Sequence, residues 1–469
     1  MAPTAAFRTS GETRLIMRHA ATVWIGQVAV MAFGVTDTIV AGHYAQDALS
    51  ALSVGSAIFI TVYISLMGVL QALLPVWAEL HGAQRSADVG RAARQSLYLC
   101  AATSIAGMAL LLFPGALLRW TDVPEPMRAQ VTVYLRILAY TLPSALLFRL
   151  FSTLNQSLGH PRLVTVLQIA ALVPKVLLSI ALTFGLEING IRLPALGLVG
   201  CGWATLIVNY AMLIAALWLL RTQPIYRAYA IWQRIEAPDW QQIGHFLRLG
   251  IPGGLTVLVE VTSFTLMALF IARLGNTATA AHQIVANLTG LAYMTPLSLA
   301  IATSARVSFW LGAGNPARAR QTCTRGFALA LGFTLLYCAL MVALRHILPG
   351  IYTDDPGVQA IAATLLLATA AYHLADEVQT LSVFVLRSYR ITVLPLVIYC
   401  ALLWGVGLTG GYLLAYRGLG PWAALHTPLA FWLMAALALI LAALLLVALL
   451  LHTLRRGRGA TQRQRGIVR

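Results

Sequence analysis

Four ionisable side chains lie in stretches of sequence that are otherwise apolar: Asp37, Lys175, Glu260 and Asp376. Asp37 lies in the apolar stretch 24–42, which is long enough to cross a bilayer. A carboxylate placed there costs about 2.5–3.5 kcal/mol on insertion scales. Such a residue usually faces a helix-bundle interior or a water-filled cavity, where it carries an ion, a proton or a substrate. We favour this functional interpretation of Asp37 over the alternative, a structural carboxylate paired with a neighbouring helix.

Glu260 and Asp376 have the chemistry of an ion-coupling site. Glu260 lies near the middle of the apolar stretch 245–272, and Asp376 lies in the second half of the stretch 358–386. Tyr372 precedes Asp376 by four residues, so both lie on one face of a helix. Two buried carboxylates and a phenol oxygen predict either an oxygen-ligand site for Na⁺ or a proton relay. The alternative is that interhelical hydrogen bonds hold both carboxylates.

Lys175 is the only lysine in the chain, and it follows Pro174 within the apolar stretch 162–185. About 15–20 Å of helix separates it from either membrane edge. A lysine side chain reaches roughly 6 Å, so it cannot extend to water and needs a cavity or an anionic partner. Our hypothesis is that Lys175 approaches Asp37 in one state and competes there with a cationic substrate. The alternative is that it only hydrogen-bonds carbonyl groups freed by the Pro174 kink.

The elements that must position these residues are membrane helices. Hydrophobic residues make up 59% of the 469 residues and charged residues only 10%, whereas soluble domains carry about 25% charged residues. The apolar runs are long and continuous, unlike the short alternating strands of a β-barrel. The sequence predicts an all-α polytopic membrane protein. We expect twelve transmembrane helices at about 20–42, 50–74, 95–113, 131–153, 162–185, 196–220, 245–272, 279–302, 322–345, 358–386, 391–416 and 424–452.

The net charge of +17 comes from arginines that lie mostly in the short gaps between spans. This distribution favours contact with anionic lipid headgroups over nucleic-acid binding. One set of loops holds only a minority of the arginines, at positions 119, 128, 192, 273, 345 and 417. The opposite loops and both termini hold most of the others, so both termini are predicted to be cytoplasmic.

No pattern indicates a cofactor or an enzyme. The five cysteines lack metal-ligand spacing, and most lie within apolar runs. The sequence contains no nucleotide-binding P-loop, no Gly-x-Ser-x-Gly elbow and no His-Glu-x-x-His motif. We therefore expect transport to be driven by an ion gradient of H⁺ or Na⁺, without a cofactor.

The chain is predicted to be an internal duplication. A constant shift of 230 residues along the sequence, which we call the repeat offset, aligns Ala48 with Ala278 and Tyr63 with Tyr293. An ungapped offset across several spans predicts two six-helix parallel repeats with a binding site between them. The predicted segments are a cytoplasmic N-terminus (1–19), an N-lobe (20–220), a cytoplasmic linker (221–244), a C-lobe (245–452) and a basic cytoplasmic tail (453–469).

At these residues the chain resembles the multidrug and toxic compound extrusion (MATE) family, in its NorM-like branch. The sharpest matches are 35–42 (VTDTIVAG), 281–287 (AHQIVAN), 294–300 (MTPLSLA) and 311–316 (LGAGNP). The resemblance implies two lobes that alternate between inward and outward openings and export bulky, often cationic organic compounds in exchange for Na⁺ or H⁺. It implies a bacterial inner-membrane protein, which we expect to be monomeric.

The resemblance also assigns roles to residues. The family's first-helix aspartate falls on Asp37, and its C-lobe acidic pair with a nearby tyrosine falls on Glu260, Asp376 and Tyr372. Gln283 and Asn287, from the 281–287 match, are further candidates for the cavity lining. The family often has asparagine close after the proline of span 5, where this chain has Lys175. A cationic lysine would repel Na⁺ from an N-lobe site.

Two other functions compete with multidrug export. A flippase for lipid-linked precursors would share the architecture, but it would be expected to line its cavity with several arginines that bind pyrophosphate. A membrane-embedded enzyme would need a dense catalytic cluster or a substantial soluble loop, and neither is visible in the sequence.

Overall fold

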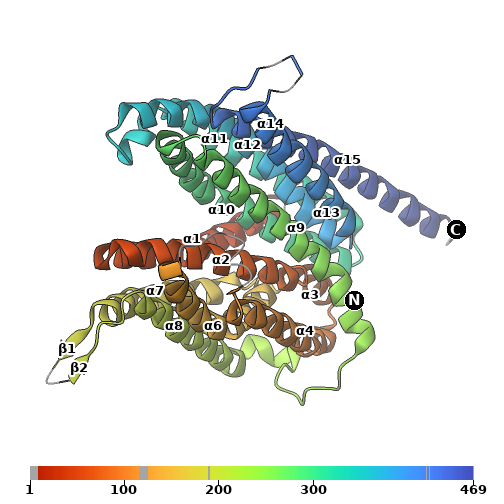
Figure 1. Ribbon diagram of the computed structural model, residues 1–469. Helices are drawn as coiled ribbons and strands as arrows, with labels where there is room; N and C mark the ends of the chain where they lie inside the picture. Colours follow the sequence, from red (N-terminus) through yellow and green to blue (C-terminus); the bar gives the residue numbers. More distant parts are fainter. Residues whose placement is uncertain (1–8, 116–124, 189–190, 419, 422, 468–469) are drawn as a thin grey trace. The chain divides into compact units, whose positions relative to one another are not determined.

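The computed structural model describes residues 9–115, 125–188, 191–418, 420–421 and 423–467 (Figure 1). Within these residues, twelve helical spans are long and apolar enough to cross a membrane, which confirms the predicted number. Parts of the predicted segments lie outside the described residues: 1–8 of the N-terminus, 116–124 (with Arg119) and 189–190 of the N-lobe, 419 and 422 of the C-lobe, and 468–469 of the tail.

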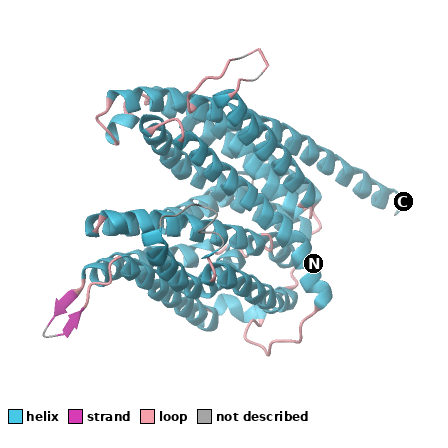
Figure 2. Cartoon of the chain, in the orientation of Figure 1, coloured by secondary structure: helices cyan, strands magenta, loops and turns pink. Residues whose placement is uncertain are grey.

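The elements, in chain order, are α1 (Thr9–Tyr44), α2 (Gln46–Gln71), α3 (Leu74–Gly82), α4 (Ser86–Leu112), α6 (Glu125–Ser157), α7 (Pro161–Phe184), β1 (Leu186–Ile188), β2 (Ile191–Leu193), α8 (Leu198–Thr222), η1 (Pro224–Tyr229), α9 (Trp240–Ala272), α10 (Asn276–Gly312), α11 (Pro316–Ala343), η2 (Leu348–Ile351), α12 (Pro356–Ser388), α13 (Val393–Tyr399), η3 (Cys400–Thr409), α14 (Gly410–Tyr416) and α15 (Leu429–Ile467). The two short strands pair antiparallel in a hairpin, and helices account for most of the remaining described chain (Figure 2).

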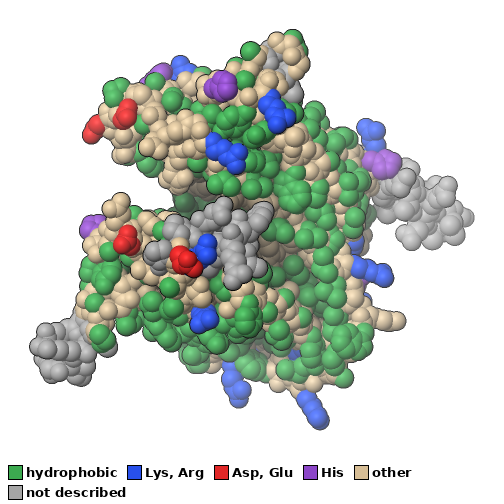
Figure 3. All heavy atoms as spheres, viewed as in Figure 1, with side chains coloured by type: hydrophobic (Ala, Val, Ile, Leu, Met, Phe, Trp, Pro, Cys, Tyr) green, Lys and Arg blue, Asp and Glu red, His purple; other side chains and the backbone are tan. Residues whose placement is uncertain are grey.

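The outer surfaces of the helices are apolar, as a bilayer requires. Hydrophobic side chains cover much of the face shown in Figure 3. Large side chains such as Ile105 and Ile214 are 68% and 66% exposed. In water such exposure would be unfavourable, whereas lipid solvates these side chains and the helices satisfy their own backbone hydrogen bonds.

Thr22–Gly254 forms one compact unit, which we call the N-terminal unit. Helices α2, α4 and α6 pack together in it, and α7 packs on α8. Its apolar core includes the fully buried side chains of Leu70, Trp77 and Leu135. Helix α8 also packs on α6, so the polar side chains that α7 and α8 contribute to the site described below are held against the rest of the unit.

The predicted linker 221–244 is ordered against α4. Arg94 on α4 makes a bidentate ion pair with Glu236, with Nε 2.8 Å from Oε2 and Nη2 on the other carboxylate oxygen. This hydrogen bond holds the pKa of Glu236 down at about 2. Gly90 allows the Tyr229 carbonyl to approach α4, because a Cβ atom there would lie 1.7 Å from that oxygen.

Met1–Ala21 and Leu255–Arg469 form a second compact unit, the C-terminal unit. Its central helix is α12, which packs on α10, α11 and α15. Trp432 and Phe431 on α15 are fully buried in its apolar core. The central position of α12 explains why its polar side chains are removed from lipid.

The first turns of α1 belong to the C-terminal unit through Glu12. Its carboxylate accepts hydrogen bonds from Arg306 Nε and Nη2 at 2.8 and 2.9 Å. Trp310 Nε1 donates at 3.1 Å and Thr322 Oγ1 at 3.4 Å. Charge-assisted bidentate pairs are the strong class of hydrogen bond, so this end of α1 is firmly anchored.

Helix boundaries reproduce the repeat offset of the predicted duplication. The shift that aligns Tyr63 with Tyr293 also carries the start of α2, Gln46, onto the start of α10, Asn276. It carries the start of α4, Ser86, onto the start of α11, Pro316. The repeat therefore extends to the positions at which helices start.

Two turns between helices repeat the same backbone conformation. Gln84 and Gly314, which the repeat offset aligns, both have positive φ, at 60° and 68°. Gly159 and Arg390, which are one residue away from alignment by the repeat offset, also have positive φ, at 78° and 62°. Each pair has glycine, which adopts this conformation without strain, in only one repeat. The duplicated fold thus fixes the turn even where the residue type disfavours it.

The structure also departs from simple continuous spans. The second span is divided into α2 and α3, and Pro75 lies in the first turn of α3, where its missing N–H costs nothing. The eleventh span contains a π-helical segment, η3, between α13 and α14. Helix α15 continues to Ile467, so the predicted basic tail is helical as far as Ile467.

Candidate functional site

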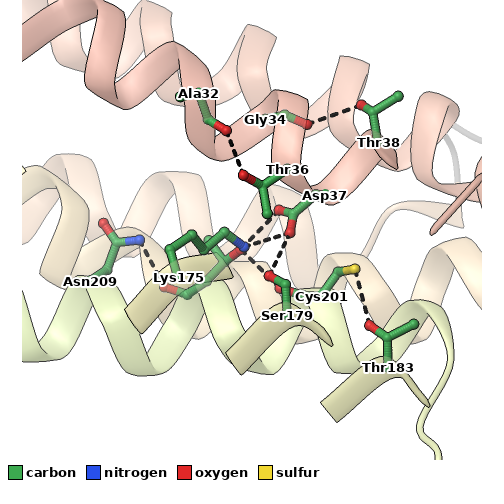
Figure 4. Close-up of polar contacts among 11 residues, drawn as sticks. Ala32, Gly34, Thr36, Asp37, Thr38, Lys175, Ser179, Thr183, Cys201 and Asn209 are labelled. Carbon is green, nitrogen blue, oxygen red and sulfur yellow. Dashed lines mark hydrogen bonds and ion pairs between the residues drawn. The ribbon is translucent and has the colours of Figure 1, made fainter. Parts of the chain in front are cut away.

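Asp37 and Lys175 form an ion pair within the N-terminal unit (Figure 4). Lys175 Nζ lies 2.6 Å from Asp37 Oδ1, and the exposed fractions of Lys175 and Asp37 are 0% and 8%. Asp37 comes from α1 and Lys175 from α7, in the helical turn that contains Pro174. The predicted approach of these two residues is therefore present in this structure.

Neutral hydroxyl groups complete the surroundings of this pair (Figure 4). Ser179 Oγ donates to Asp37 Oδ1 at 3.0 Å, and Lys175 Nζ donates to Thr205 Oγ1 at 2.7 Å. Thr205 Oγ1 also lies 3.3 Å from Asp37 Oδ2 and 2.9 Å from the Cys201 carbonyl oxygen. The ammonium group thus occupies a cluster of oxygen atoms of the kind that would otherwise suit a small cation.

Helix geometry explains how three helices supply this cluster. Ser179 follows Lys175 by four residues, so both side chains lie on the same face of α7. Thr205 follows Cys201 by four residues on α8, and α7 and α8 pack closely along their length. Asp37 on α1 then meets this shared face.

The C-terminal unit contains the second predicted carboxylate site. The carboxyl groups of Glu260 on α9 and Asp376 on α12 interact electrostatically. Asp376 is 2% exposed and accepts a hydrogen bond from Gln379 Nε2 at 2.9 Å. His373 Nδ1 lies 3.9 Å from the other oxygen of Asp376. Within the described residues no cluster of three or more His, Cys, Asp or Glu side chains could hold a metal ion.

Phenol groups and an arginine surround the two carboxyl groups. Tyr372, which was predicted to join the site, interacts electrostatically with both Asp376 and Glu260. The same interactions are made by Tyr293 on α10 and Tyr399 on α13. These phenols supply hydroxyl groups that can donate to a carboxylate or coordinate a cation.

Arg387 places a positive charge beside the C-terminal site. It is 4% exposed, lies near the end of α12 and interacts electrostatically with Glu260. Its guanidinium is also in contact with the ring of Phe384, 4.7 Å from the ring centroid. The site therefore contains a fixed cation as well as two acids.

An aromatic wall adjoins these acids. The ring of Tyr372 lies 5.6 Å from that of Trp432 and 5.9 Å from that of His373. Trp432 donates its indole N–H to His282 Nδ1 at 3.2 Å, as expected for a hydrogen-bonded core histidine. Such a wall holds the polar residues in one orientation and keeps lipid away from them.

The remaining sequence candidates lie elsewhere. Glu377 points away from Asp376, as its position on the helix indicates, and accepts a hydrogen bond from Thr334 Oγ1 on α11 at 2.7 Å. Gln283 and Asn287 are exposed residues on α10, four positions apart and on one helix face.

Sequence reasoning missed the residues that support the site. Ser179 and Thr205 carry no charge, and their role depends on which helices meet. For Ser179 a signal was available, because it stands four residues after the lone lysine. Gln379 had a similar signal, three residues after Asp376. Arg387 gave no such signal, because arginines near helix ends usually extend to the membrane surface.

Comparison with known proteins identifies relatives along nearly the whole chain. The MatE family model matches residues 23–180 and 252–413. The probable multidrug resistance protein NorM of Aromatoleum aromaticum is 36% identical over 97% of this chain and 96% of its own length. The multidrug resistance protein PmpM of Pseudomonas aeruginosa is 33% identical over 96% of this chain and 93% of its own length.

Solved structures show the same fold at low sequence identity. The eukaryotic MATE transporter AtDTX14 superposes with a TM-score of 0.85 at 16% identity, covering 96% of this chain and 99% of that one. The Vibrio cholerae MATE transporter VcmN in its bent form gives a TM-score of 0.81 at 18% identity, covering 96% and 98%.

Proposed function

We propose, from the premise that the chain belongs to the MatE family, that it is a secondary active multidrug exporter that exchanges organic cations for protons by alternating access. One observation carries the proposal: acidic side chains within membrane spans are assembled into a polar site in each unit. Intramembrane carboxylates are costly and mark ion or substrate pathways. The relatives named as multidrug resistance proteins support the choice of cargo.

In the N-terminal unit, Asp37 acts as the proton acceptor and Lys175 as a tethered cation. While Asp37 is ionised, the ammonium group neutralises it and fills the oxygen cluster. A proton that arrives at Asp37 removes the negative charge that holds the ammonium group. A cationic substrate that approaches Asp37 competes with Lys175 for the same carboxylate. Both events break one contact between α1 and α7 and so bias the unit toward another conformation.

The tethered ammonium makes H⁺ a better coupling ion than Na⁺ in the N-terminal unit. Two cations within one oxygen cluster would repel each other strongly in a medium of low dielectric. In the C-terminal unit, Glu260 and Asp376 are free to bind either ion, with phenol oxygens such as that of Tyr372 as further ligands. Here too we propose a proton as the coupling ion, and a Na⁺ requirement would be the outcome against it.

The two competing functions are less well supported. A flippase for lipid-linked pyrophosphates would need a cationic cavity, whereas Lys175 is neutralised by Asp37 and the C-terminal site has two acids. The relatives are named as multidrug resistance proteins, which supports a transporter over a membrane-embedded enzyme.

We further propose the membrane setting. The protein would lie in the bacterial inner membrane as a monomer, with both termini in the cytoplasm and loop arginines against anionic lipid. The uneven distribution of arginines between the two sets of loops supports this orientation.

The test is dye efflux from proteoliposomes under separately imposed pH and Na⁺ gradients. A fluorescent organic cation should be transported when only the pH gradient is present. Transport driven by Na⁺ alone would refute proton coupling and leave multidrug export standing. Absence of transport under both gradients would refute export of this class of compound.

A further inference from the structure

Arg149 is a buried guanidinium in the N-terminal unit. It lies on α6, inside the span Met127–Ser157, and is 5% exposed. Its Nε and Nη2 have no hydrogen-bond partner among the described residues. No carboxylate in the described part of the chain forms an ion pair with it. Arginine is almost never buried without a partner, because an uncompensated charge in a low-dielectric interior is costly.

The C-terminal unit contains a second buried arginine, which lies beside an acid. Arg387 is buried to a similar degree, and it interacts electrostatically with Tyr293 and with the carboxyl group of Glu260. Arg387 Nε also lacks a hydrogen-bond partner among the described residues, so the nearby carboxyl group of Glu260 is what distinguishes Arg387 from Arg149.

The N-terminal unit also has a buried arginine beside the aligned tyrosine but has no acid there among the described residues, although the repeat offset itself does not align Arg149 with Arg387. Arg149 interacts electrostatically with Tyr63, the residue that the repeat offset aligns with Tyr293. The same offset places Val30 at the position of Glu260. At this aligned position the C-terminal repeat therefore has the acidic side chain of Glu260, and the N-terminal repeat has the apolar side chain of Val30.

Helices α2 and α6 run side by side in the same direction. Gly55 on α2 lies against the ring of Tyr134 on α6. Further along both helices, Leu66 and Leu142 lie together against Gly107. Residues that follow Gly55 on α2 and Tyr134 on α6 by the same number of positions therefore lie at similar depths in the membrane.

A second donor without a partner lies at the depth of Arg149. Gln71 is 4% exposed, and its Nε2 has no hydrogen-bond partner among the described residues. It follows Gly55 by about as many residues as Arg149 follows Tyr134. The Arg149 guanidinium and the Gln71 amide nitrogen are thus two buried hydrogen-bond donors on neighbouring helices, and neither has an acceptor among the described residues for the atoms named above.

We propose that Arg149 binds a monovalent anion, with the Gln71 amide available as a further donor. The ligand is a single negative charge that accepts hydrogen bonds from the guanidinium, either chloride from solution or the carboxylate of a zwitterionic substrate. Guanidinium binds such groups through two parallel N–H donors, which matches its unpartnered Nε and Nη2. The inference does not depend on proton coupling.

The chloride source is tested by the stability of the purified protein. Melting temperatures are measured while chloride replaces gluconate at constant ionic strength. A ligand of the folded state should raise the melting temperature by about 3 °C when it exceeds its dissociation constant tenfold. Arg149→Met should lose this response and, in gluconate, be at least as stable as the parent, because a buried unpaired charge has been removed. Arg136→Met is the matched control, since Arg136 is an exposed arginine on the same helix, and it should keep the chloride response.

The carboxylate source is tested by transport. Efflux of a zwitterionic amino-carboxylate compound is compared with efflux of its methyl ester. Arg149→Met should reduce efflux of the carboxylate at least tenfold relative to the ester, about the loss expected for one charge-assisted hydrogen-bonded pair.

Either response in the parent, lost in Arg149→Met, supports an anion site and identifies its source. A parent that responds to neither chloride nor the carboxylate overturns the proposal without need of any variant. A response that persists in Arg149→Met also overturns it, because the anion must then bind elsewhere. If Arg149→Met does not fold, Arg149→Lys and Gln71→Leu take its place: a weakened anion response in either variant supports the site, and an unweakened response in both overturns it.

Discussion

The ion pair between Asp37 and Lys175 predicts that substitution of either residue lowers stability, and that the two variants respond to pH in opposite directions. In Asp37→Asn the ammonium group of Lys175 remains fully buried and loses its carboxylate partner. Removing one partner of a buried ion pair typically costs about 3–5 kcal/mol. We therefore expect Asp37→Asn to destabilise the N-terminal unit as well as to abolish efflux.

The loss of stability in each variant is limited by the free-energy cost of changing the protonation of the charged residue that remains. Asp37→Asn can avoid a buried charge if the lysine releases its proton, and for a free lysine side chain this costs about 4.6 kcal/mol at pH 7 and about 2 kcal/mol at pH 9. Lys175→Met can avoid it if the aspartate takes up a proton, which for a free aspartate costs about 4 kcal/mol at pH 7 and about 1.5 kcal/mol at pH 5. The first variant should thus recover stability as pH rises, and the second as pH falls.

The assay is the thermal loss of the monodisperse peak in detergent, measured from pH 5 to pH 9 for the parent and both variants. The double variant Asp37→Asn with Lys175→Met has no buried charge in this cluster, so its stability should approach that of the parent while efflux stays absent. Ser179→Ala serves as the control, because it removes one hydrogen bond from a hydroxyl group to Asp37 and leaves both charges of the ion pair in place. It should cost about 2 kcal/mol, without the pH profile of either charge variant.

Parallel pH profiles would refute this reasoning. If Asp37→Asn and Lys175→Met both follow the parent from pH 5 to pH 9, neither residue depends on the other for its charge. A double variant that is as unstable as the sum of its single variants would lead to the same conclusion, because paired residues must show a coupling energy. Near-normal efflux by Asp37→Asn at matched expression would remove Asp37 from the transport mechanism.

Two further predictions concern other carboxylates. Glu260→Gln and Asp376→Asn should each cripple ion-coupled dye efflux, and the double variant should be hardly worse than either, because interacting carboxyl groups bind their protons as a pair; independent, multiplicative losses would argue for separate roles. Glu236→Gln should lower the melting temperature at pH 7 because Arg94 loses its bidentate partner. The pKa of Glu236 is lowered to about 2. The ion pair's contribution to the free energy of unfolding is therefore fully present above the ordinary pKa of a glutamate and is lost as pH falls toward 2. The gap from the parent should therefore narrow between pH 5 and pH 3, and a constant gap would contradict the ion pair.

The spans could be predicted from sequence because bilayer insertion depends on local composition. All twelve predicted stretches lie in or overlap the observed spans. Hydropathy could not reveal where a span stops being regular. The break between α2 and α3 and the π-helical segment η3 both lie inside apolar sequence, so they depend on packing. Ordering of the linker by Arg94 was also out of reach, since Glu236 lies 142 residues away.

The site residues that could be predicted from the sequence are those whose charge is costly to bury inside a membrane span. Asp37 and Lys175 stood out because charge is rare inside spans, and a buried lysine demanded a partner. Glu12 and Arg306 form an equally specific contact, with two hydrogen bonds of 2.8 and 2.9 Å. They gave no sequence signal, because charges at the end of a span are ordinary. Sequence reasoning thus finds charges that are expensive where they stand, and misses those that become important through tertiary contact.

The two units use one fold with different charge arrangements, and this difference suggests a division of labour. In the N-terminal unit the polar cluster is electrically balanced by its own lysine, so a proton or a cationic substrate must displace a bond that already exists. In the C-terminal unit two acids face one arginine, so Glu260 and Asp376 have one negative charge to spare when both are ionised. A cation is thus attracted to the C-terminal site without breaking an ion pair. We therefore expect the C-terminal site to attract the coupling ion, and the Asp37–Lys175 ion pair to break when a proton or a cationic substrate reaches Asp37.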